Sequence, residues 1–418
     1  MSACGLDFGT SNTTLGRVID QVPVLVALEA GQTTIPSAIF YGRDGAALIG
    51  RRAIDAYVDG VPGRLMRSLK SVLGTALIDE TTQVGRERSS FRDVIAAYLR
   101  AVKRRAEQAA DQDFRHVVHG RPVHFVDNEP DADRKAEQVL HAIIREIGFD
   151  DVTFQFEPIA AALEYERQIA GEETALIADI GGGTSDFSIV RLSPQRHHKA
   201  ERKSDILAND GVRIGGTDFD RRLSLGVLMP HFGFGSVMKR AGLDAPTSYF
   251  HDLATWSSIN RMYEPQVASA IRQVRKEARQ PKLFDRLLRV LDEQRGHTLA
   301  MAIEHAKIAL SDVQRAEIAL EWVEPNLTTA VTRPDVVSHT GELAARIGAR
   351  IKTCLDQAGL PADAIDAVFL TGGSVQLAHM RRAIVEHVPA ARVIEGDTFG
   401  AVGKGLTIEA ARRYGSGG

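Results

Sequence analysis

The sequence contains few cysteines and no long apolar run. Its 418 residues include two cysteines, Cys4 and Cys354, which excludes a disulfide framework and a zinc site built from four cysteines. No stretch approaches the roughly 18 consecutive apolar residues that a membrane-spanning helix needs. The first residues have neither the basic nor the apolar segment of a secretory signal. These absences predict a soluble protein of the reducing cytoplasm that makes no contact with a membrane.

The chain also lacks a large excess of positive or of negative charge. Lys and Arg number 51 and Asp and Glu number 54, so the formal net charge is −3 at pH 7. A protein that binds nucleic acid through general positive charge is therefore not expected. Hydrophobic residues make up 44% and charged residues 25% of the chain, as in most globular proteins, and the length suggests two to four domains.

The sequence does contain a repeated unit of strand, turn and strand. Each copy has an apolar strand with an aspartate near its end, then a turn of glycine and hydroxyl residues, then a second strand. The expected strands cover residues 3–8, 13–19, 174–180 and 185–192. The aspartates are Asp7 and Asp179, which are 172 positions apart. Repetition of a whole supersecondary unit predicts two related halves with a ligand site in the cleft between them.

Helical segments and a third turn complete the pattern. Apolar spacing predicts helices at 90–111, 133–147, 159–168 and 399–413 and a mostly helical stretch over 223–322. The segment 53–85 has several Gly and Pro breakers, which are typical of a small irregular subdomain. An apolar strand at 367–371 leads directly into another glycine-rich turn.

The three turns favour a phosphate site. They are Gly9, Thr10, Ser11 and Asn12; Gly181, Gly182, Gly183 and Thr184; and Gly372, Gly373 and Ser374. Glycine lets the backbone approach a ligand, successive N–H groups form an anion nest, and the hydroxyls add donors. One such turn is more often a tight hairpin, but three, two of them after an aspartate at the same offset, predict a phosphate clamp. Asp7 and Asp179 can hold a hydrated Mg²⁺ against the phosphates.

At these turns the sequence resembles the actin-like ATPases, and more closely the DnaK-type heat-shock chaperones. Further matches run in order along the chain. They are Lys70 within 69–74, the segments 157–162 and 215–220, the helix residues Glu304, Lys307 and Ser311, and the segments 370–374 and 397–405. Within the family the chain is most similar to short bacterial YegD-like members that lack the peptide-binding domain. Phe156 stands where the family's hinge motif has Asn.

The resemblance implies a fold class, α/β, of the actin-like ATPase (ribonuclease H-like) type. This is a duplicated fold of two lobes with a central nucleotide cleft. Lobe I would cover 1–170 with a subdomain inserted at about 34–93. Lobe II would cover 171–391 with a helical subdomain inserted at about 223–340. The remaining 392–418 would form a strand and a hinge helix that returns to lobe I.

The resemblance also implies binding of ATP or ADP and slow, Mg²⁺-dependent hydrolysis coupled to cleft closure. The turns would cradle phosphates, and Asp7 and Asp179 would hold Mg²⁺ through water. The residues that would place the attacking water are Lys70, Glu157, Asp179 and Thr184. Further nucleotide contacts are implied for Gly215, Gly216, Glu304, Lys307, Ser311 and Asp397. Protein clients or co-chaperones are the partners implied beside the adenine nucleotide.

Departures from the family pattern keep other functions open. Ile308 stands where the family has an Arg that stacks on adenine, and Val375 and Gln376 stand where it has Thr-Arg. The alternatives are a scaffold that binds ATP but barely hydrolyses it, a small-molecule kinase, and a filament-forming protein of the same superfamily. Because the chain ends at Gly418, we expect no peptide-binding domain. The histidines at 116, 119 and 124 are interpreted as structural and 195–203 as a solvated loop.

Overall fold

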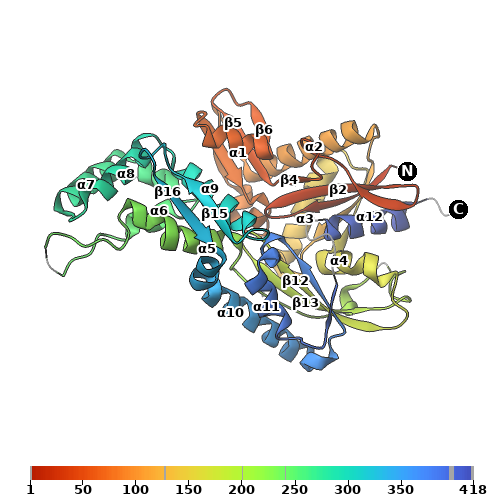
Figure 1. Ribbon diagram of the computed structural model, residues 1–418. Coiled ribbons are helices and arrows are strands. Elements are labelled where there is room, and N and C mark those ends of the chain that lie inside the picture. Colours follow the sequence, from red (N-terminus) through yellow and green to blue (C-terminus); the bar gives the residue numbers. More distant parts are fainter. Residues whose placement is uncertain (1, 127–128, 200, 241, 395–399, 416–418) are drawn as a thin grey trace. The chain divides into compact units, whose positions relative to one another are not determined.

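The computed structural model describes residues 2–126, 129–199, 201–240, 242–394 and 400–415. The chain forms two compact units (Figure 1). The first consists of residues 1–213, 349–375 and 384–418, and the second of residues 214–348 and 376–383.

Two sheets of matching strand order lie in the first unit. One has the order β11-β10-β1-β2-β3, with β4 paired to β2, and the other has the order β18-β17-β12-β13-β14. The strands of the first sheet are β1 (Ala3–Phe8), β2 (Asn12–Ile19), β3 (Val22–Leu25), β4 (Thr34–Pro36), β10 (His116–Arg121) and β11 (Asp151–Phe156). Those of the second are β12 (Glu173–Ile180), β13 (Ser185–Leu192), β14 (Ile206–Val212), β17 (Ala367–Thr371) and β18 (Arg392–Ile394). The repeat seen in the sequence thus extends to five strands in each copy.

Each sheet combines parallel and antiparallel pairs in the same way. β1 is parallel to β10 and antiparallel to β2, and β12 is parallel to β17 and antiparallel to β13. In register, Asp7 lies opposite Thr14 and Asp179 opposite Asp186. Ligands of such open sheets bind at the carboxyl ends of the parallel strands. Both aspartates lie at those ends.

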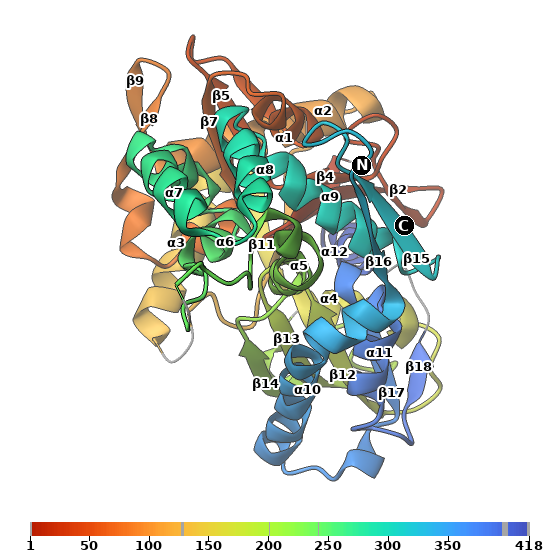
Figure 2. The same ribbon diagram turned by 60° about the vertical axis from the view of Figure 1, so that its left-hand side comes forward.

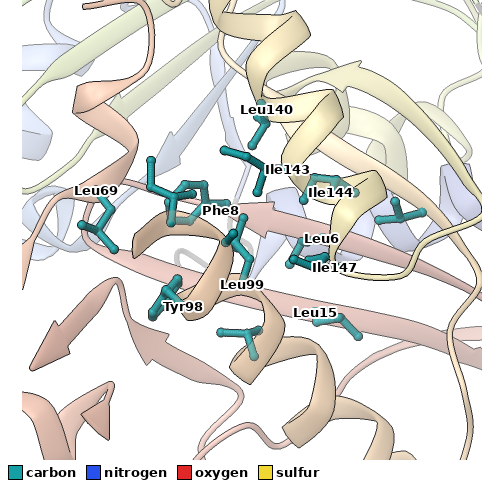
Figure 3. Close-up of a cluster of buried hydrophobic side chains, with 14 of the residues drawn as sticks. Leu6, Phe8, Leu15, Leu69, Tyr98, Leu99, Leu140, Ile143, Ile144 and Ile147 are labelled. Carbon is teal, nitrogen blue, oxygen red and sulfur yellow. The ribbon is translucent and has the colours of Figure 1, made fainter. Parts of the chain in front are cut away.

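Helices cover both faces of the first sheet. Helices α2 (Phe91–Ala110) and α3 (Pro130–Glu146) pack on one face, where their apolar residues join those of β1 and β2 in a buried cluster (Figure 3). Helix α2 begins as the sequence predicts because the hydroxyl of Ser90 accepts the N–H of Asp93 at 3.1 Å and forms a capping box. Helix α3 begins at Pro130, three residues before the predicted start, because proline suits the first helical position.

The other face carries α4 (Glu157–Glu166) and α12 (Ala401–Tyr414), whose buried residues include Ala160, Leu406 and Ala410. The contact between these two helices is so close that a Cβ atom on Gly405 would lie 1.8 Å from the carbonyl oxygen of Ala160. Only glycine fits there.

Between β4 and α2 the chain forms a small subdomain. Its elements are β5 (Ala38–Gly42), β6 (Ala47–Ile49), α1 (Arg51–Val58), β7 (Gly63–Arg67), the 3₁₀-helices η1 (Leu69–Val72) and η2 (Ala76–Asp79), and the hairpin of β8 (Thr81–Val84) and β9 (Glu87–Ser90). Strands β6, β5 and β7 pair in that order. Within 53–85, the segment predicted to be irregular, β7 pairs with β5 and β8 pairs with β9, which the Gly and Pro breakers of this segment concealed.

The second unit is mainly helical. It contains α5 (Gly216–Leu223), the π-helix η4 (Ser224–Leu228), η5 (Met229–Phe232), α6 (Ser248–Leu253), η6 (Ile259–Tyr263), α7 (Pro265–Glu277), α8 (Pro281–Asp292) and α9 (Gly296–Ala309). A hairpin of β15 (Arg315–Ala319) and β16 (Thr328–Thr332) follows α9 (Figure 2). The remaining elements of the chain are η3 (Lys203–Asp205), α10 (Arg333–Ala358), η7 (Ala362–Ala364), η8 (Gly373–Gln376) and α11 (Ala378–Val385). Among the described helices, none has both the length and the hydropathy of a membrane span.

Candidate functional site

The two repeated turns have the same backbone geometry. The N–H of Gly9 donates to the carbonyl oxygen of Asn12 at 2.9 Å, and the N–H of Gly181 donates to that of Thr184 at 2.9 Å. Each turn connects a strand that carries an aspartate to its antiparallel neighbour. The sequence repeat is therefore also a repeat of hydrogen bonding.

The turns need glycine because other chain atoms approach them closely. A Cβ atom on Gly182 would lie 2.3 Å from the hydroxyl of Ser11, so the first two turns face each other. Gly372, in the third turn, has a φ of 81°, and a Cβ there would lie 2.8 Å from Oδ1 of Asp179. The structure therefore gathers all three turns in the first unit. Ser374 lies there too, but its side chain is buried.

A lysine and a glutamate form an ion pair next to the sheet edge. Lys70 lies in η1, and its Nζ is 2.5 Å from Oε1 of Glu157, the first residue of α4. Their side chains are only 10% and 19% exposed. A Cβ atom on Gly120, at the end of β10, would lie 3.2 Å from Cγ of Glu157. Two of the four residues predicted to place the attacking water are thus paired with each other within the first unit.

Three aspartates in the same region share one electrostatic environment. Burial, and next the Glu157 carboxylate, raises the pKa of Asp7 to about 7 despite the opposing effect of Lys70. Burial and Glu157 also raise the pKa of Asp179. Desolvation by the surrounding chain atoms, and next the Asp179 carboxylate, raises the pKa of Asp186, although its side chain still reaches solvent. The four carboxylates of Asp7, Asp179, Asp186 and Glu157 therefore surround a single positively charged side chain, that of Lys70.

The same carboxylates raise the pKa of Lys70. Burial lowers the pKa of Lys70, but the carboxylates of Glu157 and Asp7 outweigh burial, so its pKa lies above the ordinary value of 10.5. Lys70 is therefore fully protonated at neutral pH, and negative charge remains in excess around it. This excess would be offset by a cation bound with the phosphates.

The donor set fits Mg²⁺ held through water and phosphate. Among the described residues, no three His, Cys, Asp or Glu side chains lie close enough to bind a metal ion directly. Mg²⁺ usually keeps several waters and takes one or two carboxylates together with substrate phosphate. Asp7 and Asp179 offer carboxylates of this kind beside turns in which Gly9, Gly182 and Gly372 leave no room for a Cβ atom.

The hydroxyl of Thr184 forms a hydrogen bond with the carboxylate of Asp186. The hydroxyl donates to Oδ2 of Asp186 at 2.9 Å, and both side chains are open to solvent. A hydroxyl that donates to a carboxylate keeps its oxygen lone pairs available to accept a hydrogen bond from water. Asp186 was seen in the sequence as part of the second strand, but its bond to Thr184 was not expected.

The second unit brings together another part of the expected site. Nζ of Lys307 lies 2.8 Å from the Asp220 carboxylate and donates to the carbonyl oxygen of Gly216 at 3.1 Å. Gly215 caps the same helix α5, where its N–H donates to Asp218 at 3.0 Å. The ammonium group of Lys307, a residue of α9, therefore binds groups of α5 and joins the two helices.

The remaining residues of α9 point in several directions. Glu304 is half-buried, whereas the side chain of Ile308 is 54% exposed. Ser311, just after the helix, lines a hollow of about 140 Å³ together with Leu377 and His379. Asp397, also predicted to contact the nucleotide, lies outside the described residues.

Ser37 supports the first turn and was missed by sequence reasoning. Its hydroxyl donates to the carbonyl oxygen of Gly9 at 2.7 Å, and its N–H donates to that of Ser11 at 2.8 Å. Ser37 is 2% exposed and lies between β4 and β5. A serine after a proline at a strand end was the one available signal, and it does not identify a partner 28 positions away.

The structure also accounts for one of the three histidines, His119, and for the polar segment 195–203. His119 is fully buried, and burial lowers its pKa to about 3, so its ring is neutral. The segment 195–203 is not a solvated loop throughout, because Arg202 is 1% exposed and binds both carboxylate oxygens of Glu166 at 2.8 and 2.9 Å. The expectation for this segment was wrong because it took a run of polar residues for an exposed one.

Comparison with known proteins agrees with the motifs. The family model described as Hsp70 protein matches residues 3–233 and 276–413. The chain is 26% identical to a "Chaperone protein HscA homolog" of Aromatoleum aromaticum, over 98% of this chain and 57% of that protein. It is 26% identical to "Chaperone protein DnaK" of Halobacterium salinarum, over 92% of this chain and 51% of that protein. The chain thus spans a little over half the length of these relatives, and because the family model matches most of it, the chain belongs to the Hsp70 family.

Proposed function

We propose that this chain binds ATP and ADP with Mg²⁺, hydrolyses ATP slowly, and acts as the nucleotide switch of a chaperone-type protein. The observation that carries the proposal is the Lys70–Glu157 ion pair of 2.5 Å, buried among aspartates beside three glycine-rich turns. Membership in the Hsp70 family supports nucleotide binding in general. The cytoplasmic location remains a prediction from the sequence.

In this proposal the backbone N–H groups of the turns bind phosphate oxygens, and the turns exclude larger side chains from that space. Mg²⁺, when bound, supplies charge neutralisation at the transferring phosphoryl group. Lys70 brings a protonated ammonium group to the same region, and Glu157 orients it. Thr184 and Asp179 are the groups that would hold the attacking water by accepting hydrogen bonds from it.

Client handling is proposed only in general terms. The relatives named as chaperones are almost twice as long as the part of them that this chain matches. We therefore propose that the matched residues carry the nucleotide-dependent step of a chaperone cycle, with protein clients or co-chaperones as partners.

One observation favours the scaffold that binds but barely hydrolyses ATP. Ile308 exposes 54% of its surface where the family's Arg would stack on adenine, so the cation–π contribution to base binding is missing. The small-molecule kinase has no comparable support, because a lysine paired with a glutamate suits a water nucleophile.

Nucleotide binding by calorimetry and phosphate release under multiple turnover test the proposal. The wild-type chain should bind ATP and release phosphate slowly, and removal of Mg²⁺ with EDTA should abolish release. Lys70→Ala and Asp179→Ala should each lower turnover by about a hundredfold or more, as expected when charge stabilisation of a transition state is removed. Arg115→Ala, which removes an exposed ion pair with Asp150, is the matched control and should change nothing.

The outcomes separate the candidates. Binding without release of phosphate would favour the scaffold. Transfer of phosphate to a small-molecule acceptor rather than to water would favour the kinase. No binding of any adenine nucleotide would contradict the site assignment and leave only the fold.

A further inference from the structure

Helix α4, which carries Glu157, lacks a polar cap at its start. The N-cap residue is Phe156, with φ −64° and ψ 129°, and its side chain accepts no hydrogen bond from the first turn. Ser, Thr, Asp and Asn are the residues that normally fix this position. A catalytic glutamate in the first turn therefore depends on some other contact for its direction.

Arg121 supplies that contact from the neighbouring strand. It lies opposite Phe156 in the pairing of β10 with β11. Its guanidinium lies 5.1 Å from the ring centre of Phe156 and 5.3 Å from that of Phe125. A planar cation packed against two aromatic rings is attracted by both and limits their movement.

The guanidinium is itself held in place. It lies 3.1 Å from Oδ2 of Asp133 and pairs with Glu137, both on α3, and its side chain is 13% exposed. Asp133 also accepts the N–H of Phe125 at 2.6 Å, which anchors the second ring. Two carboxylates and two rings thus define the position of one arginine, and α3, β10 and β11 meet there.

We propose that Arg121 is a positioning residue that fixes Phe156, and through it Glu157, in the orientation that binds Lys70. The inference rests on the proposed function for its catalytic consequence. The physical step is short, because Phe156 and Glu157 are consecutive and Glu157 is the first helical residue. A small movement of Phe156 away from the Arg121 guanidinium would turn the Glu157 carboxylate away from Lys70, whose Nζ lies 2.5 Å from Oε1 of Glu157.

A purely structural role for the cluster gives different results. If Arg121 only joined α3 to the sheet, its removal would lower stability and leave the activity of the folded protein unchanged. If Arg121 acts through Glu157, its removal lowers kcat, leaves nucleotide affinity intact, and has no effect once Glu157 is already neutralised. These differences make the two roles separable by experiment.

The experiment compares Arg121→Ala, Arg121→Lys and Phe156→Leu with the control Arg115→Ala, each also measured for thermal unfolding. Arg121→Ala should lower kcat for ATP about tenfold or more, with KM and the Kd for ADP within about twofold, because misplacing a positioned group affects the reaction step. Arg121→Lys should recover only part of the loss, since lysine has no planar fork. Amide hydrogen exchange across 157–166 in the nucleotide-free chain should become faster in Arg121→Ala and Phe156→Leu.

The double variant Arg121→Ala with Glu157→Gln decides the mechanism. Its kcat should equal that of Glu157→Gln alone, because a residue that acts through Glu157 has nothing left to position. Multiplied losses in the double variant, or a kcat for Arg121→Ala equal to that of the wild type, would overturn the inference. If the wild type hydrolyses no ATP, the proposed function fails instead. Unchanged hydrogen exchange across 157–166 in Arg121→Ala would even then overturn the inference that Arg121 positions Phe156 and Glu157.

Discussion

Replacing Asp7 by Asn should stabilise the nucleotide-free protein while it removes a residue of the proposed site. The pKa of Asp7 is raised from 3.8 to about 7 by burial and Glu157. At about 1.4 kcal/mol per pH unit, the whole difference corresponds to roughly 4 kcal/mol of unfavourable ionisation above pH 7. Asp7 is only half-buried and shares its titration with neighbours, so about 2 kcal/mol is a realistic expectation.

The sign of the pH dependence follows from the direction of the shift. A carboxyl group whose pKa is raised on folding contributes stability below its unfolded pKa, and that stability is lost as the pH rises through about 7. Asp7→Asn should therefore raise Tm at pH 8 by roughly 3 °C. At pH 5.5, where the wild-type carboxyl group is already protonated in the folded chain, the advantage should shrink by about half.

Thermal unfolding by circular dichroism in EDTA, without nucleotide, at both pH values checks this prediction. Asp150→Asn is the matched control, because Asp150 forms an exposed ion pair with Arg115 and its removal should shift Tm little and equally at both pH values. A Tm for Asp7→Asn equal to or below that of the wild type at pH 8 would refute the reasoning. So would an advantage of the same size at pH 5.5.

Three further predictions concern buried charge, packing and helix propensity. Arg202→Met should destabilise the chain by about 3–5 kcal/mol in urea unfolding, because it leaves the Glu166 carboxylate buried without its bidentate partner. Gly405→Ala should also destabilise it, by about 2 kcal/mol or more, since the added carbon would lie 1.8 Å from the carbonyl oxygen of Ala160. Gly341→Ala, at a glycine of α10 with no atom within 4 Å of the added carbon, should instead stabilise by about 0.5–1 kcal/mol.

Arg134→Ala is the control for the buried arginine, because its ion pair with Asp131 is exposed and should contribute less than about 1 kcal/mol. Equal losses for Arg134→Ala and Arg202→Met would contradict the assigned burial energy. A neutral Gly405→Ala would mean that α4 and α12 can move apart without cost.

The fold class was predictable because its signals are local. Alternation of apolar residues, an aspartate, and a glycine-rich turn recur 172 positions apart, and together with the family motifs they gave the actin-like ATPase fold of the Hsp70 family, which is confirmed. Lys70 and Glu157 were both expected at the site from motifs, but the ion pair of 2.5 Å between them was not predicted. The domain boundaries stay predictions, as do the roles of individual site residues.

Contacts between distant segments were not predictable from local pattern. Nothing near Ser37 indicates that its hydroxyl binds Gly9, and nothing near Lys307 indicates that its ammonium group is taken up by Asp220. Such pairings are set by the path of the chain through the fold, which a periodicity or a motif does not contain. The same limit explains why Arg202 was taken for a solvated side chain.

The registers of the two hairpins have a consequence for the direction of a bound ligand. The turns present equal backbone frames, but Thr14 lies opposite Asp7 where Asp186 lies opposite Asp179. Two turns with the same backbone hydrogen bonding would by themselves bind a chain of phosphates equally well in either orientation. The additional carboxylate makes one end of the site more negative, so a polyphosphate bound as proposed would favour one orientation. The difference between the two copies at this one register position thus adds to the Lys70–Glu157 pair and the third turn, which also have no counterpart in the other copy, in giving the site a polarity.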